Sequence, residues 1–169
     1  MTHVVAGYPT LDDTVKLVLG MQSAGADFVE IQIPFSDPIA DGPVIMEANT
    51  KVLKNAVTVE NCFDLAKRLS KNVDIPLLFM GYFNTVFRKG VFAFAEKCRA
   101  VGIQGLIVPD IPVDEEENDH FIAACEKNDI LHISVLSPNS TGERIALNAK
   151  HQDGFVYCTA YAGTTGGKN

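Results

Sequence analysis

The chain has 169 residues, of which 47% are hydrophobic and 21% are charged, with 13 Gly and 8 Pro. This composition is that of an ordinary globular domain and excludes a disordered or collagen-like chain. The net charge of −7 comes with no basic stretch, so neither nucleic acid nor an anionic membrane surface is expected as a partner. No apolar run reaches the ~18 residues that span a bilayer.

The first predicted strand covers residues 2–6 and is followed by a helix with Thr10 as its N-cap and Gly25 just beyond its end. A second strand is predicted at 27–33. The segment 34–55 then carries a helical stretch of its own after Gly42-Pro43, and a further helix begins after Thr58.

The second half of the chain continues this alternation. Strands are predicted at 75–80, 104–108, 130–136 and 154–159. Between them lie a helix at 91–101, followed by Gly102, and helices capped by Asp114 and Thr141. The four cysteines are widely spaced, without a Cys-x-x-Cys pair, so free thiols in a reduced cytosolic setting are expected and a metal site is not.

The spacing of these strands indicates parallel strand–helix units. The strands begin about 25 residues apart, except for one gap of 48 residues that contains the extra helix. Six units suit either a doubly wound sheet or most of a (β/α)₈ barrel. Because a complete barrel needs at least ~200 residues, and the chain stops after its sixth strand, we expect one incomplete domain over 1–169.

Glu30 is the first candidate for chemistry. Strict alternation in the second strand places Phe28, Glu30 and Gln32 on one face and Val29 and Ile31 on the other. A carboxylate in an apolar strand is costly unless it is paired, exposed or neutralised. At the carboxyl end of a barrel strand it would face the mouth, where active sites lie, although pairing with a neighbouring Lys or hydroxyl is an equally good interpretation.

Two aspartates follow in a stiff loop with three prolines. Asp41 lies shortly before Gly42-Pro43 and a helix, so by pattern alone it is more simply an N-cap than a functional residue. Asp37, which precedes Pro38, is an ordinary turn residue by the same criterion.

The stretch PFSDPIADGP at 34–43, preceded by Glu30, resembles the signature of the tryptophan synthase alpha subunit family. Shorter matches occur in the same order at other strand ends: AGYPT at 6–10, MGYFN at 80–84, PDIP at 109–112 and GTTG at 163–166. The resemblance covers nearly the whole chain. It implies an α/β fold of the (β/α)₈ TIM-barrel type, truncated here to about six strand–helix units.

The resemblance also implies a cytoplasmic lyase of tryptophan biosynthesis, which cleaves indole-3-glycerol phosphate to indole and glyceraldehyde 3-phosphate. Glu30 would be the catalytic acid/base and Asp41 its partner. Protonated Glu30 would deliver a proton to indole C3, while ionised Asp41 would accept a hydrogen bond from the indole N–H. The apolar setting of Glu30 is expected to raise its pKa into the working range.

Further roles follow from the same resemblance. Tyr82 and Tyr157 would line the indole pocket, and Thr165 and Gly166 would belong to a loop that closes over Asp41. The docking surface for the tryptophan synthase beta subunit, in a heterotetramer, would include Asp37, Pro38 and Asn84. The pyridoxal phosphate of that assembly is expected only in the beta subunit, with neither a cofactor nor a metal in this chain.

The chain also departs from the family. Gln32 stands where many relatives have Gly, and Tyr161 stands where many have Arg, so substrate contacts and the coupling of the loop to the partner are expected to differ. The family holds the substrate phosphate mainly after strands 7 and 8, which this chain lacks. We therefore expect the 169 residues by themselves to be unstable or self-associated, and to cleave the substrate poorly.

Two other functions remain open. One is another phosphosugar-type barrel enzyme, although such enzymes lack the Glu30-to-Asp41 spacing and the PFSDP stretch. The other is a non-catalytic subunit that docks on a beta-type partner and regulates it.

Overall fold

The computed structural model describes residues 1–151, 154–160, 162 and 163, in which strands and helices alternate. The strands are β1 (Thr2–Val5), β2 (Val29–Gln32), β3 (Leu77–Met80), β4 (Gly105–Ile107), β5 (Leu131–His132), β6 (Val135–Leu136) and β7 (Tyr157–Cys158). The helices are α1 (Leu11–Ser23), α2 (Pro43–Lys54), α3 (Val59–Leu69), α4 (Phe83–Lys89), α5 (Val91–Ala100), α6 (Glu116–Asp119), α7 (Phe121–Lys127) and α8 (Gly142–Lys150). A short 3₁₀ helix, η1, covers Val113–Glu115.

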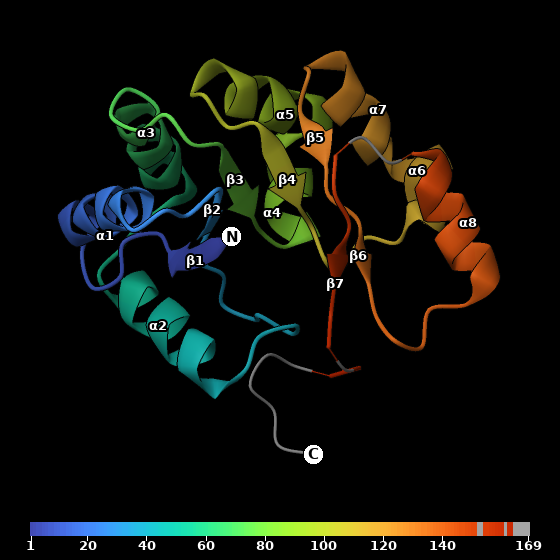
Figure 1. Ribbon diagram of the computed structural model, residues 1–169, viewed down its shortest axis with the longest axis horizontal. Helices are drawn as coiled ribbons and strands as arrows, with labels where there is room; N and C mark the ends of the chain where they lie inside the picture. The colour runs from blue at the N-terminus through green and yellow to red at the C-terminus, as the bar shows by residue number, and fades with distance from the viewer. Residues whose placement is uncertain (152–153, 161, 164–169) are drawn as a thin grey trace.

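The strands pair in parallel and in chain order. β1 to β5 form one sheet in the order β1-β2-β3-β4-β5, and β6 pairs with β7 beside it (Figure 1). A doubly wound sheet would reverse its strand order at a switch point, and no reversal occurs among the described strands. The prediction of a barrel-type parallel sheet, with an extra helix α2 between its second and third strands, is therefore confirmed.

The predicted strand 130–136 is two short strands rather than one. The first part pairs with β4, where the N–H of Ile133 donates to the carbonyl of Leu106 at 2.9 Å. The second part pairs with β7, where the N–H of Tyr157 donates to the carbonyl of Ser134, also at 2.9 Å. β4 ends at Ile107, before it reaches the position opposite Val135. The chain therefore changes pairing partner in the middle of the strand.

The helices α1, α3, α5 and α7 follow one another along the outer side of the sheet (Figure 1). The main core lies between them and the sheet. It takes Val29, Ile31 and Ile33 from β2 and its carboxyl end, with Phe63 of α3 and Phe94 of α5. A smaller apolar cluster lies on the opposite, inner face of the sheet. Since both faces of β2 are covered, all four of its residues are buried, as is typical of a parallel strand.

Three of the predicted helix starts are confirmed. The side chains of Thr10, Thr58 and Thr141 each accept a backbone N–H in the first turn of the following helix. Gly25 and Gly102, just beyond α1 and α5, have φ of 88° and 87°, a left-handed conformation that glycine adopts without strain.

The predicted cap at Asp114 is wrong. Asp114 lies inside η1, whose N-cap is Pro112, and its carboxylate pairs with Arg144 at 2.5 Å. The helical segment that follows is also interrupted, because His120 takes a left-handed conformation between α6 and α7. Glu116 offsets this break, since its carboxylate accepts the N–H groups of Ile122 and Ala123 at the start of α7.

Two further observations concern the described residues. None of their helices combines the length and the apolar character needed to cross a membrane. All four cysteines are free, and Cys62, Cys98 and Cys125 are buried.

Candidate active site

A cavity of about 580 Å³ opens on the inner face of the sheet. Glu30 and Gln32 reach it from β2, His3 from β1, and Asp41 from the loop that follows β2. The described residues that line it are His3, Glu30, Gln32, Ala40, Asp41, Ile45, Met80, Ile107, Pro109, Val135, Ser137, Asn139, Ser140, Arg144, Tyr157, Thr159, Ala162 and Gly163. Its volume lies within the range of small-molecule sites, ~300–1,000 Å³.

Glu30 lies on the cavity side of β2, as the alternation of the strand predicts, and is only 6% exposed. No side chain among the described residues donates a hydrogen bond to its carboxyl group. Burial, followed by the nearby charge of Asp41, raises the pKa of Glu30 to about 7. Near neutral pH the group is therefore partly protonated, which is the state that a general acid requires.

Asp41 is buried in the cavity wall and is not a helix cap. The N-cap of α2 is Gly42, without any side-chain hydrogen bond. The Asp41 carboxylate instead accepts the Gln32 side-chain amide at 2.6 Å and the Tyr82 hydroxyl at 3.0 Å, both on Oδ2. The simpler interpretation of Asp41 as an N-cap is thus wrong, because its acceptor atoms point into the sheet rather than along α2.

The loop that carries Asp41 is held at both ends. The N–H of Phe35 donates to the Asn49 side chain of α2 at 3.0 Å, and the N–H of Asp41 closes a turn onto the carbonyl of Pro38 at 3.0 Å. The Phe35 ring stacks on Tyr82 with centroids 5.2 Å apart. These contacts, together with the prolines of the loop, explain why a loop residue holds a defined position.

The two predicted tyrosines have different positions. Tyr157 lines the cavity, and burial, with a smaller effect of the Glu30 charge, raises its pKa. Tyr82 does not line the cavity: its ring is buried behind Asp41, and its hydroxyl accepts the N–H of Ala40 at 3.0 Å while donating to Asp41. Burial raises the pKa of Tyr82 above its ordinary value, so the hydroxyl remains a donor. The geometry makes Tyr82 a support for Asp41.

Other predicted residues lie elsewhere. Thr165, Gly166 and Tyr161 fall outside the described residues. Of the three predicted docking residues, Asp37 and Asn84 are exposed, whereas Pro38 is buried.

Two cavity residues were missed as site residues by the sequence analysis. Gln32 was noted only as a departure from the family, and His3 would by pattern be a strand histidine. In the structure His3 Nε2 lies 2.9 Å from the side-chain oxygen of Gln32. Their shared signal is period-two spacing on an inner strand face, because β1 pairs with β2 and His3 is in register with Glu30.

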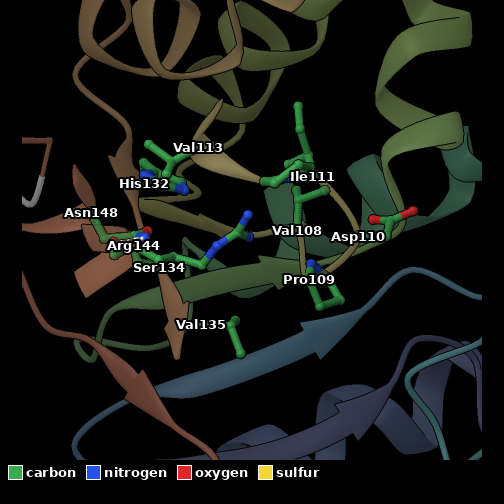
Figure 2. A pocket seen from close by; sticks show the side chains of 11 residues that line it. Val108, Pro109, Asp110, Ile111, Val113, His132, Ser134, Val135, Arg144 and Asn148 are labelled. Carbon is green, nitrogen blue, oxygen red and sulfur yellow. Dashed lines mark hydrogen bonds between the residues drawn. The ribbon is translucent and has the colours of Figure 1, made fainter. Parts of the chain in front are cut away.

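A second, smaller cavity of about 160 Å³ adjoins the first and shares Pro109, Val135 and Arg144 with it. Figure 2 shows Arg144 extending from α8 between His132 on one side and Pro109 on the other. His132 Nδ1 and Ser134 Oγ are buried here without a hydrogen-bond partner among the described residues. This cavity extends the polar surface beside the main one. In neither place do three potential metal ligands from the described chain come together.

The burial of Glu30 has a consequence for stability that needs no assumption about function. A carboxyl group whose pKa is raised on folding stabilises the fold below its unfolded pKa, and this contribution is lost as pH rises through the folded value of about 7. The test compares the free energy of unfolding of Glu30→Gln with that of the unmutated protein at two pH values. We expect the difference, variant minus unmutated protein, to be about 3 kcal/mol larger at about pH 8 than at about pH 5. Urea unfolding at the two pH values measures this difference. The exposed Glu96→Gln is the control, and an equal effect of both variants would contradict the burial of an unpaired carboxyl group.

The whole chain, residues 1–169, matches the family model described as "Tryptophan synthase alpha chain". The alpha chain from Syntrophotalea carbinolica is 48% identical over 98% of this chain and 65% of its own length, and that from Desulforapulum autotrophicum is 43% identical with the same coverage. The chain thus spans 65% of the length of these relatives.

Solved structures agree with this match. A structure of Mycobacterium tuberculosis tryptophan synthase superimposes with a TM-score of 0.91 at 33% identity, over 99% of this chain and 64% of that one. A tryptophan synthase complex from Pyrococcus furiosus superimposes with a TM-score of 0.87 at 31% identity, over 93% of this chain and 64% of that one. On sequence and fold, this chain belongs to the tryptophan synthase alpha chain family.

Proposed function

We propose that the protein carrying this chain cleaves indole-3-glycerol phosphate to indole and glyceraldehyde 3-phosphate. The observation that supports this most strongly is the pair of carboxyl groups in one cavity: Glu30, buried with a pKa raised to about 7, and Asp41, which accepts two hydrogen bonds. Two carboxyl groups in such different environments are suited to the acid and the acceptor roles of one reaction.

The proposed reaction uses these two groups in sequence. Glu30, as the carboxylic acid, donates its proton to C3 of the indole ring, which becomes positively charged at N1. Asp41 accepts a hydrogen bond from the indole N–H and stabilises that charge. The Glu30 carboxylate then takes the proton of the hydroxyl on the adjacent side-chain carbon. As the carbon–carbon bond breaks, its electron pair returns to the ring and the hydroxyl carbon becomes the aldehyde, so no net proton is gained or lost.

We further propose that this protein docks on a tryptophan synthase beta subunit, which would hold the pyridoxal phosphate of the assembly. Large apolar side chains are exposed next to the Asp41 loop: Ile39 is 71% exposed and Val44, at the start of α2, is 77% exposed. Exposed apolar residues clustered beside a site are typical of a protein interface. The Pyrococcus furiosus structure with a similar fold is a tryptophan synthase complex.

The first prediction concerns the acid. In the complete protein, Glu30→Gln preserves the shape of the side chain but cannot transfer a proton, so indole formation is expected to fall by ~10²–10⁴. Steady-state release of indole measures this, with Glu96→Gln as a surface control. Turnover within a few-fold of the unmutated protein would end the assignment of Glu30 as the acid.

The second prediction concerns pH. Because Glu30 must be protonated to act as the acid, kcat/KM is expected to decline as pH rises through about 7. Asp41→Asn removes the charge that contributes to the raised pKa of Glu30, so this decline should move to lower pH in the variant. The profiles can be followed with sensitive detection of indole even if the variant is slow. A decline that does not move would show that Asp41 does not influence Glu30.

The third prediction concerns the partner. Val44→Asp places a charge on an exposed apolar position and is expected to weaken binding to the beta subunit by about tenfold or more. Isothermal titration calorimetry measures this, and Leu17→Asp, at an exposed apolar position on α1, is the matched control. Equal affinities for both variants would place the interface elsewhere.

A further inference from the structure

A chain of hydrogen bonds links four segments of the fold at the candidate active site. It runs from His3 on β1 through Gln32 on β2 to Asp41 in the following loop, and on to Tyr82 at the end of β3. The three bonds measure 2.9, 2.6 and 3.0 Å. Gln32 is at its centre and is completely buried.

The direction of each bond follows from the groups present. An ionised carboxylate can only accept, so the Gln32 side chain must turn its NH₂ group toward Asp41. Its oxygen then faces His3, and because that oxygen can only accept, His3 Nε2 must carry a hydrogen. A hydrogen on His3 Nε2 is therefore the state of the ring that is compatible with this orientation of the Gln32 amide.

The same bonds determine the orientation of the Asp41 carboxylate in the cavity. Both Gln32 and Tyr82 donate to Oδ2, and no described residue donates a hydrogen bond to Oδ1. Two donors on one oxygen hold the plane of the carboxylate and leave the other oxygen available to a ligand. An acceptor that is held in place before the reaction costs no reorganisation when charge develops.

The charged surroundings of His3 agree with a neutral ring. Burial lowers the pKa of His3, and the opposing effects of the Gln32 hydrogen bond and the Asp41 charge are smaller. Glu30, Arg144 and Tyr157 also line the cavity that His3 and Asp41 face, from β2, α8 and β7. A neutral ring with its hydrogen on Nε2 supplies the donor that Gln32 needs.

We propose that Gln32 is a positioning residue that orients the Asp41 carboxylate for the reaction proposed above, and that His3 sets the orientation of the Gln32 side chain. Neither residue touches the reacting atoms in this scheme. This inference rests on the proposed function for its effect on rate, but the hydrogen-bond direction that it requires can be measured without turnover.

The kinetic experiment uses the complete protein. Gln32→Leu keeps a similar volume and removes both hydrogen bonds, so kcat for indole release is expected to fall about 10- to 100-fold, with a smaller change in KM. His3→Phe is expected to lower kcat in the same direction, whereas His3→Gln, whose amide can still donate to Gln32, should restore most of the rate. Gln104→Leu, at an exposed position before β4, is the matched control.

The spectroscopic experiment uses the unmutated protein, so it does not depend on the folding of any variant. Ring ¹⁵N shifts of labelled histidine, with His3 assigned from the His3→Gln spectrum, are expected to show a hydrogen on Nε2 and none on Nδ1. In Gln32→Leu the Nε2 shift is expected to change, because the hydrogen on Nε2 loses its acceptor. A hydrogen on Nδ1 of His3 in the unmutated protein would overturn the proposal.

The kinetic outcomes separate the two proposals. If the positioning role is wrong, Gln32→Leu keeps its turnover while Glu30→Gln is inactive. If the proposed function is wrong, the unmutated complete protein itself releases no indole from indole-3-glycerol phosphate.

Discussion

The structure depends on the burial of β2 between two layers. In a parallel strand that is covered on both faces, alternate side chains point toward opposite layers. In β2, Val29 and Ile31 pack toward the helices, whereas Glu30 and Gln32 face the cavity. A carboxyl group placed in this way loses solvent on all sides. The raised pKa of Glu30 is therefore a direct result of its position in the sheet.

The second carboxylate is kept different from the first by its hydrogen bonds. Asp41 is as buried as Glu30, at 7% and 6% exposure, but it receives two donors, one from Gln32 and one from Tyr82. Burial without such donors favours the neutral form of a carboxyl group, as at Glu30. The charge on Asp41 in turn helps to keep Glu30 protonated. Asp41 thus contributes, after burial, to the raised pKa of Glu30.

The loop between β2 and α2 connects this pair to the surface. Its inner end holds Asp41 against Tyr82, while Ile39 is exposed a short distance away along the chain. Under the function proposed above, a partner that binds the exposed side would contact the segment that carries the proposed acceptor, Asp41. The hydrogen bonds of Phe35 and Pro38 hold this loop in shape between its buried and its exposed side.

The sequence by itself determined those features of the fold that depend on local rules of strand and helix formation. Alternation in the second strand assigned Glu30 to the inner face, threonines marked three helix starts, and the spacing of the strands indicated parallel units; the family resemblance then selected the barrel over a doubly wound sheet. These features involve residues two to four positions apart, or the length of one strand–helix unit. The alternation also brought Glu30 forward as a candidate, whereas Asp41 became one only through the family resemblance.

Only the tertiary structure decided the rest. That Asp41 is no helix cap, that Tyr82 supports it from behind, and that His3 and Gln32 join it depend on contacts between residues 9 to 41 positions apart. The division of the fifth predicted strand likewise depends on which strand lies beside each half. Local patterns determine the face on which a side chain lies, but its partner across that face is set by the packing of segments that are distant in the chain.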